Sequence, residues 1–242
     1  MIHLRSQAFA RPSPHRPEAF FDPVSYRVFF PVTSPLRSLV TGRDGWAKRA
    51  ADIVLAMSML VLLWIPMVLC AALIRLDSPG PVLFRQTRIG LDGQPFSLLK
   101  FRTMHHAEPE GAGWKQATRD DPRITRIGQI LRCTSLDELP QILNVLRGEM
   151  SIVGPRPHAI GTRAGGRLFE EITHFYHDRH QVRPGLTGLA QVRGWRGETD
   201  TEEKFLRRLE CDLEYIETWS IRLDLQILWR TIFSVLRMRN AY

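Results

Sequence analysis

The pattern of hydrophobic and polar positions divides the chain into three parts. Residues 1–44 contain scattered prolines and arginines without a sustained hydrophobic period, so we predict a mostly irregular extension there. An uncharged apolar run then extends from Ile53 to Ile74. Beyond it, short apolar stretches alternate with turn residues and with helical spacings. The pattern therefore predicts a membrane helix within residues 45–80 and a folded domain over residues 81–242.

The apolar run is long enough to cross a bilayer, but its surroundings favour a different path. Roughly 22 residues at a helical rise of about 1.5 Å each extend about 33 Å, which matches the hydrocarbon core. Pro66 lies inside the run and favours a kink. Lys48 and Arg49 precede the run and Arg75 follows it. Because basic flanks favour the cytoplasmic face, we predict a re-entrant helix that bends near Pro66, with a straight spanning helix as the alternative.

The remaining pattern predicts a mostly helical α/β domain. Pro81–Arg85 and Phe96–Phe101 are typical of short strands, and the Asp92-Gly93 turn between them predicts a β-hairpin. Three helical spacings follow, at Ile124–Leu131, 136–146 and Phe205–Ile216. The segment 223–238 is apolar around much of its circumference and carries arginines at its edge. Core packing and a surface-lying amphipathic membrane helix are both open for it.

Composition narrows the class of partner. The 242 residues include 33 Lys and Arg against 25 Asp and Glu, a formal net charge of +8. Such a balance indicates an anionic partner, which can be nucleic acid, an acidic lipid surface or a phosphorylated substrate. Cys70, Cys133 and Cys211 lie far apart and fit neither a disulfide framework nor a zinc pattern. We therefore expect the domain to face a reducing compartment.

The most informative segment is Thr134–Gln141, which contains the adjacent carboxylates Asp137 and Glu138. Ser135 and Glu138 fit a capping box, and acidic residues favour a helix N-terminus, so a plain helix start explains the segment without any chemistry. The alternative is a reactive anionic pair among phosphate-binding cations. Arg132 lies just before the pair and is the first such cation.

Three further motifs favour chemistry over a helix cap. They are Lys100-Phe101-Arg102-Thr103-Met104, Gly154-Pro155-Arg156-Pro157 and Arg183-Pro184-Gly185-Leu186-Thr187-Gly188. Together with the carboxylate pair they resemble the bacterial sugar transferases, the monotopic phosphoglycosyl transferases that prime polysaccharide assembly on a polyprenol phosphate. The resemblance extends from about Lys48 to the C-terminus, and a chance match of several ordered motifs is improbable. It implies a membrane-associated domain with a re-entrant helix and amphipathic interfacial helices.

The resemblance also implies a mechanism. Asp137 corresponds to a nucleophile that attacks the sugar-linked phosphate of a UDP-sugar, expels UMP and holds the sugar phosphate covalently. Polyprenol phosphate then attacks this intermediate. Glu138 corresponds to a residue that assists the second step or helps to hold Mg²⁺, and we expect Asp137 and Glu138 to be the metal ligands because Mg²⁺ prefers oxygen.

Five basic residues are candidate ligands for the substrate phosphates: Arg132, Arg156, Lys100, Arg102 and Arg183. Arg132 and Arg156 match family positions beside the phosphates, although an arginine near a helix end can also cap carbonyls. Lys100 and Arg102 fall on one face of a strand, which can equally be the face toward lipid headgroups. Arg183 opens a glycine-containing turn suited to an anion, with a plain turn as the alternative.

The segment Gly194–Thr201 resembles family members that transfer glucose 1-phosphate, so UDP-glucose is the expected donor, with galactose or an N-acetylated sugar as alternatives. The implied partners are a UDP-sugar, polyprenyl phosphate and membrane lipids at the cytoplasmic face of the bacterial inner membrane, and a homodimer stays open. A second hypothesis is a basic, membrane-tethered binding protein for nucleic acid or acidic lipid. It gives the carboxylate pair no task, and without a nucleic-acid motif we expect no nucleic-acid partner.

Overall fold

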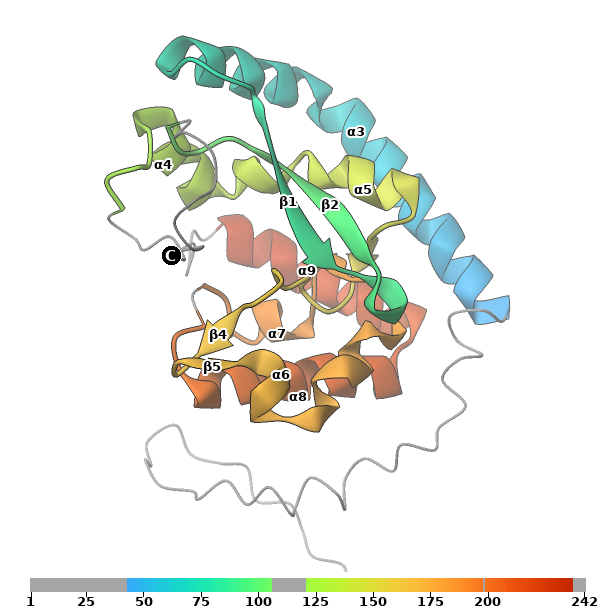
Figure 1. The fold of residues 1–242 in the computed structure, drawn as a ribbon. Coiled ribbons are helices and arrows are strands. Elements are labelled where there is room, and N and C mark those ends of the chain that lie inside the picture. Colours follow the sequence, from blue (N-terminus) through green and yellow to red (C-terminus); the bar gives the residue numbers. More distant parts are fainter. Residues whose placement is uncertain (1–42, 106–120, 198, 237–242) are drawn as a thin grey trace, which may run out of the picture. The chain divides into compact units, whose positions relative to one another are not determined.

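The computed structural model describes residues 43–105, 121–197 and 199–236 (Figure 1). Nearly all of the predicted irregular extension lies outside these residues. The helices are α3 Arg43–Asp77, α4 Arg126–Thr134, α5 Gln141–Arg147, α6 Phe169–Ile172, α7 Leu189–Val192, α8 Glu202–Thr218 and α9 Ile221–Leu236, with 3₁₀ turns η1 Leu91–Gly93, η2 Leu136–Glu138 and η3 His174–Gln181. The strands are β1 Leu83–Ile89, β2 Pro95–Phe101, β3 Ser151–Val153, β4 Arg163–Ala164, β5 Arg167–Leu168 and β6 Gly185–Thr187. The predicted mostly helical class with short strands is confirmed.

Helix α3 contains the whole apolar run and continues without a break across Pro66. A proline removes one backbone donor, which bends a helix without having to end it. Figure 1 shows α3 as one curved helix that extends along α5. By length and composition α3 could cross a membrane, and most side chains of its apolar stretch are not buried by the rest of the protein.

Both ends of α3 are attached to the same folded unit. Near its start, Asp52 Oδ1 accepts a hydrogen bond from the backbone N–H of Ile152 in β3 at 3.0 Å. At its last residue, Asp77 Oδ2 accepts from the backbone N–H of Ile127 in α4 at 3.2 Å. The apolar middle of the helix therefore lies between two attachment points on one domain.

The predicted hairpin is confirmed and is longer than expected on its first strand. Strands β1 and β2 pair antiparallel with Leu83 opposite Phe101 and Ile89 opposite Pro95. Asp92 takes a left-handed conformation with φ 53° in the turn, a conformation that Asp tolerates better than most residues. The hairpin matters for function because Lys100 lies near the end of β2.

The helix predicted for 136–146 is divided in the structure. Residues 136–138 form the 3₁₀ turn η2, and the regular helix α5 begins at Gln141. Pro140 has no N–H to donate to the Leu136 carbonyl, so an α-helical turn cannot close there, whereas Leu139 donates to that carbonyl at 3.2 Å. The helix ends at Arg147, and Gly148 follows it in a left-handed conformation with φ 86°.

Strands β3 and β6 form a short parallel pair, with Ser151 opposite Gly185 and Val153 opposite Thr187. A Cβ on Gly185 would lie 2.1 Å from the backbone nitrogen of Gly154, so no side chain fits between the two backbones. Gly185, from the motif that begins at Arg183, therefore allows the backbones at β3 and β6 to approach each other closely.

The last two helices are amphipathic, which the pattern predicts for the first of them and leaves as one of two possibilities for the second. Helix α8 buries Phe205, Leu209 and Ile216. Helix α9 buries Ile227 on one side and exposes Trp229 and Phe233 on another. Helix α9 therefore packs into the core on one side and exposes apolar side chains on another.

Candidate functional site

The Asp137-Glu138 pair lies in the sharp turn between α4 and α5. Ser135 ends α4 in a left-handed conformation with φ 60°, and its side chain caps no backbone N–H. Its hydroxyl instead accepts a hydrogen bond from Arg196 Nη2 at 2.7 Å. The Glu138 carboxylate also binds side chains, Lys100 and Arg156, rather than the backbone of a capping box. The capping-box interpretation is therefore wrong for this segment.

Two of the predicted cations converge on the carboxylates. Lys100 Nζ lies 2.9 Å from Glu138 Oε1 and 3.6 Å from Asp137 Oδ2. Arg156 binds both oxygens of Glu138, with Nη1 3.3 Å from Oε2 and Nη2 bonded to Oε1. These four side chains come from β2, η2 and the loop after β3. The fold thus gathers residues from three separate motifs into one cluster.

The two carboxylates differ in their electrostatic environment. Burial raises the pKa of Asp137, and the negative charge of Glu138 adds to this, while Lys100 and Arg156 oppose it. Burial also acts to raise the pKa of Glu138, but the charges and hydrogen bonds of Arg156 and Lys100 outweigh it and hold that pKa well below its usual value. Glu138 therefore stays ionised, and Asp137 is the more basic carboxylate of the pair.

Arg132 and a residue that sequence reasoning missed, Arg88, extend the positive surroundings. Arg132 Nε donates to Thr103 Oγ1 at 2.9 Å, and its charge acts to lower the pKa of Asp137. Burial, followed by the charge of Arg156, lowers the pKa of Arg88 to about 10. Arg88 pairs with Phe96, four residues before Lys100, so the two-residue period of the hairpin puts Arg88 and Lys100 on one face. The pairing register of the predicted hairpin could therefore have identified Arg88 as a residue on the same face as Lys100.

The structure does not bring Arg102 and Arg183 to the carboxylates. Strand β2 ends at Phe101, so the two-residue period no longer holds for Arg102. The buried Arg102 guanidinium donates to the carbonyls of Ser78 and Pro79, at 2.6 and 2.7 Å, just beyond the end of α3. Arg183 Nε donates to the Gly148 carbonyl at 2.9 Å, at the end of α5.

A buried ion pair supports the loop that carries Arg156. Arg179 donates from Nη2 to the Arg156 carbonyl at 2.6 Å and from Nε to Asp212 Oδ2 at 3.0 Å. Burial and the charge of Arg179 lower the pKa of His158 well below its usual value, so its neutral ring accepts from Arg179 Nη1 at 3.0 Å. Asp212 lies three residues after Leu209 on the buried face of α8, and a carboxylate in that position signals a buried cation.

A second buried arginine holds the Gly194–Thr201 segment beside the turn that contains Asp137 and Glu138. Arg208 donates to the carbonyls of Trp195 and Gly197, each at 2.6 Å, and to the Thr199 hydroxyl. Arg196, in the middle of this segment, reaches the Ser135 hydroxyl. The stretch that resembles glucose 1-phosphate transferases therefore lies next to the carboxylate pair.

Among the described residues, no group of three or more His, Cys, Asp and Glu side chains is arranged to hold a metal ion. The adjacent carboxylates of Asp137 and Glu138 are the candidate oxygen ligands for a metal ion at this site. Mg²⁺ is commonly bound by one or two carboxylates together with substrate phosphates, so Asp137 and Glu138 fit a magnesium ion that a diphosphate would help to hold.

Most of the chain matches one known protein family. Residues 43–238 match the family described as Bacterial sugar transferase. The chain is 49% identical over 213 residues to a UDP-glucose:undecaprenyl-phosphate glucose-1-phosphate transferase of Escherichia coli (strain K12), covering 88% of the chain and 45% of the relative, so it spans less than half of that protein. A protein of the same name from Caulobacter vibrioides is 55% identical over 196 residues, covering 81% of the chain and 72% of the relative.

A shorter relative is covered almost completely. The exopolysaccharide production protein PSS of Rhizobium leguminosarum bv. phaseoli is 52% identical over 195 residues, which cover 81% of the chain and 98% of the relative. The matched region contains every described residue of the carboxylate cluster. The chain belongs to the bacterial sugar transferase family, as its ordered motifs predict.

Proposed function

We propose that the protein transfers a sugar 1-phosphate, expected to be glucose 1-phosphate, from a UDP-sugar to undecaprenyl phosphate and releases UMP. The observation that carries this proposal is the Asp137-Glu138 pair in contact with Lys100 and Arg156. Relatives named UDP-glucose:undecaprenyl-phosphate glucose-1-phosphate transferase support the choice of donor and acceptor. The product would prime the assembly of an exopolysaccharide, a role supported by the name of the Rhizobium relative.

The reaction proceeds in two displacements at one phosphorus atom. A carboxylate oxygen of Asp137 attacks the sugar-linked phosphorus, the bond to the UMP oxygen breaks, and UMP leaves with the electron pair. A phosphate oxygen of the polyprenyl phosphate then attacks the same phosphorus, and the bond to Asp137 breaks. The carboxylate is regenerated and a polyprenyl diphosphate sugar is formed. The higher pKa of Asp137 relative to Glu138 supports its assignment as nucleophile.

The cations stabilise the charge that develops on the phosphate oxygens. Arg156 brings a planar, permanently charged guanidinium to the side of Glu138, and Lys100 offers a point charge between the two carboxylates. Glu138 keeps both cations in place before the substrate arrives, so little reorganisation is needed during the reaction.

We propose Mg²⁺ as a cofactor held by Asp137, Glu138 and the donor diphosphate, where it would neutralise charge on the leaving phosphate. EDTA should then stop UMP release, and added Mg²⁺ should restore it. The release of UMP from the purified protein, measured in both conditions, tests this. Full UMP release in the presence of EDTA would contradict the assignment.

We propose that α3 enters the membrane and returns to the cytoplasmic face, so that both of its ends and the catalytic domain lie at the inner face of the bacterial inner membrane. Asp52 and Asp77 attach the two ends of α3 to one domain, which supports this topology over a straight span. The largely uncovered apolar stretch of α3 supports contact with lipid.

The proposed topology predicts equal accessibility of both ends of α3. Ala47→Cys and Pro81→Cys, in a background without the native cysteines, should both resist a membrane-impermeant thiol reagent in intact cells and react after lysis. The exposed positions of Ala47 and Pro81 make both thiols reactive once the reagent has access. Labelling of the Ala47→Cys protein alone in intact cells would indicate a spanning helix.

Transfer of label from radioactive UDP-glucose to an organic-extractable lipid tests the proposed function. Membranes that contain the protein and polyprenyl phosphate should form such a lipid and release UMP. The binding-protein hypothesis predicts no labelled lipid at all. Parallel incubations with UDP-galactose and UDP-N-acetylated sugars identify the donor by the fastest transfer.

The coupling of the two carboxylates gives a pH prediction. Because the pKa of Asp137 is raised, activity should fall with decreasing pH at a higher pH than an ordinary aspartate would give. Glu138→Gln removes the neighbouring negative charge and lowers the pKa of Asp137, so the acid limb of kcat/KM should move to lower pH while turnover decreases. If the acid limb of kcat/KM does not move in this variant, the group whose protonation limits activity is not Asp137.

A further inference from the structure

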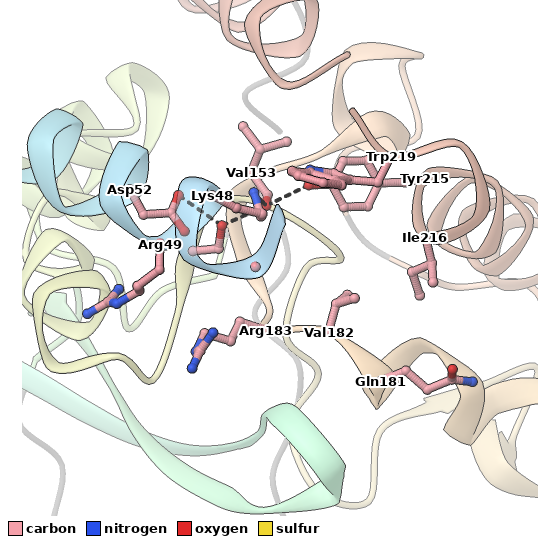
Figure 2. Close-up of a pocket in the computed structure, with 12 residues that line it drawn as sticks. Lys48, Arg49, Asp52, Val153, Gln181, Val182, Arg183, Tyr215, Ile216 and Trp219 are labelled. Atoms are coloured by element: carbon pink, nitrogen blue, oxygen red, sulfur yellow. Dashed lines mark hydrogen bonds between the residues drawn. The ribbon is translucent and has the colours of Figure 1, made fainter. Parts of the chain in front are cut away.

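A pocket at the start of α3 lies apart from the carboxylate cluster (Figure 2). Its walls come from the first turns of α3, from β3, from the segment before β6 and from the end of α8. None of Asp137, Glu138, Lys100 and Arg156 lines it. The motif that begins at Arg183, which the proposed reaction does not use, contributes to this pocket.

One side of the pocket is strongly positive. Arg49 Nη1 and Nη2 donate to the carbonyls of Val145 and Leu146, at 2.7 and 3.1 Å. Arg183 donates to the neighbouring Gly148 carbonyl, so two guanidinium groups meet at the end of α5 (Figure 2). Burial, and then the charge of Arg49, lowers the pKa of Arg183. These hydrogen bonds are to neutral carbonyls, so they do not themselves neutralise the two positive charges.

The nearby carboxylates are committed to other partners. Asp52 accepts from the Ser151 hydroxyl and from the Ile152 N–H, each at 3.0 Å. Asp224 binds Lys48 Nζ at 2.7 Å. Asp52 also lines the pocket, and its one negative charge offsets part of the charge of Arg49 and Arg183. Two guanidinium groups against one carboxylate leave an excess of positive charge from which an anion can gain favourable energy.

The opposite side of the pocket is apolar and aromatic. Val182 and Ile216 line it together with the rings of Tyr215 and Trp219. The Trp219 indole donates to Asp224 Oδ2 at 3.1 Å, so its polar edge is satisfied and its ring is available for apolar contact. The pocket thus has two arginines at one end and apolar and aromatic side chains at the other (Figure 2), a combination that matches a molecule with a phosphate joined to a hydrocarbon part.

The position of the pocket on α3 fits a lipid headgroup. Lys48 and Arg49 lie just before the uncharged run that begins at Ile53, and Trp46 is 76% exposed one turn away. Basic and tryptophan side chains at the end of an apolar helix mark the depth of the headgroups. The pocket therefore lies where the phosphate of a membrane lipid would be if α3 enters the bilayer as proposed.

We propose that this pocket binds the phosphate of an anionic membrane phospholipid through Arg49 and Arg183. The inference rests on the proposed membrane insertion of α3 and does not require the proposed transfer reaction. Bound lipid would hold the start of α3, the end of α5 and the segment before β6 together at the membrane surface.

Binding of short-chain phosphatidylglycerol to the full chain in detergent tests the proposal, with phosphatidylcholine as the zwitterionic comparison. Retained lipid is counted by native mass spectrometry. The wild type should prefer phosphatidylglycerol, and the double variant Arg49→Gln with Arg183→Gln should bind it about tenfold more weakly or worse, because two charge-assisted contacts are lost. Arg147→Gln is the matched control, since Arg147 is exposed at the same helix end and lines no part of the pocket. Equal affinity of the double variant and the control would overturn the proposal.

Arg49 and Arg183 also hold the end of α5, so the double variant can be unstable. In that case Arg183→Lys keeps the charge and one donor for the Gly148 carbonyl, and we expect a smaller loss of phosphatidylglycerol binding with the fold retained. Unchanged binding by this folded variant would count against the pocket. Displacement of the phospholipid by inorganic phosphate or by polyprenyl phosphate at equal or lower concentration would assign the pocket to those molecules and overturn the phospholipid assignment.

The proposed lipid site and the proposed transfer reaction can be tested separately. Asp137→Asn should bind phosphatidylglycerol as the wild type does, because Asp137 does not line the pocket. A wild type that binds this lipid in the pocket but transfers no sugar phosphate would overturn the proposed function alone. A wild type that transfers sugar phosphate without preferring phosphatidylglycerol would overturn the lipid site alone.

Discussion

Asp137→Asn should abolish sugar-phosphate transfer while the protein stays folded. Asparagine keeps the shape of the side chain but cannot attack phosphorus as a carboxylate does, and loss of a covalent nucleophile commonly costs about a thousandfold or more in turnover. Asp137 is 5% exposed and has its nearest ion-pair contact at 3.6 Å from Lys100, so the substitution removes no short ion pair. Transfer of radioactive label from the UDP-sugar to lipid measures the effect.

Asp92→Asn is the matched control for this experiment. It makes the same chemical change in the exposed hairpin turn, where Asn tolerates the φ of 53° as well as Asp does. Its activity should equal that of the wild type. A second measurement is the trapping of a labelled sugar phosphate on the protein, which the wild type should show without acceptor and Asp137→Asn should not. Near-normal turnover of Asp137→Asn would exclude Asp137 as the nucleophile.

The parts of the site that could be predicted depend on short-range patterns. Arg156 is expected beside the phosphates because its motif resembles that of the family, and Lys100 is a candidate on a strand face that could equally face lipid headgroups. Arg102 was expected with Lys100 because a strand repeats every two residues, but β2 ends at Phe101 and the chain turns toward the end of α3. The two-residue alternation of a strand predicts which face a side chain lies on only within the strand itself.

The turn at Ser135 shows a second limit. The letters Ser135 to Glu138 fit a capping box, yet Pro140 prevents an α-helical turn from forming there and η2 results. The side chain of Glu138 then finds Lys100 and Arg156, which are distant in the sequence. Such long-range pairings decide between a structural and a chemical role, and a local pattern cannot supply them.

The arginine network behind the site was missed for the same reason. Arg179 lies in a stretch without a clear period, and its partners Asp212 and the Arg156 carbonyl are both distant in the sequence. The sequence indicates this network only at Asp212, because a carboxylate on the buried face of a helix requires a buried partner. The comparison identifies the family, and the structure adds how the carboxylate cluster is held.

Asp212→Asn should strongly destabilise the protein. Arg179 and Asp212 are 2% and 3% exposed, and removal of one charge leaves the other buried without its counter-ion, which typically costs about 3 to 5 kcal/mol. For a domain of this size that corresponds to a fall in melting temperature of about 10 °C, measured in detergent by the fluorescence of the tryptophans. Asp200→Asn, which changes an exposed ion pair with Lys204, should leave the melting temperature nearly unchanged.

The same ion pair should also affect donor binding, because Arg179 holds the backbone of Arg156. Arg179→Lys keeps a charge beside Asp212 but loses the fork that reaches the Arg156 carbonyl as well. Measured well below its melting temperature, this variant should raise KM for the UDP-sugar several-fold and leave KM for the polyprenyl phosphate largely unchanged. Asp212→Asn, if it folds, should shift the donor KM in the same direction. Equal changes in both KM values would indicate a general loss of structure, and the role of Arg179 in positioning Arg156 would then be wrong.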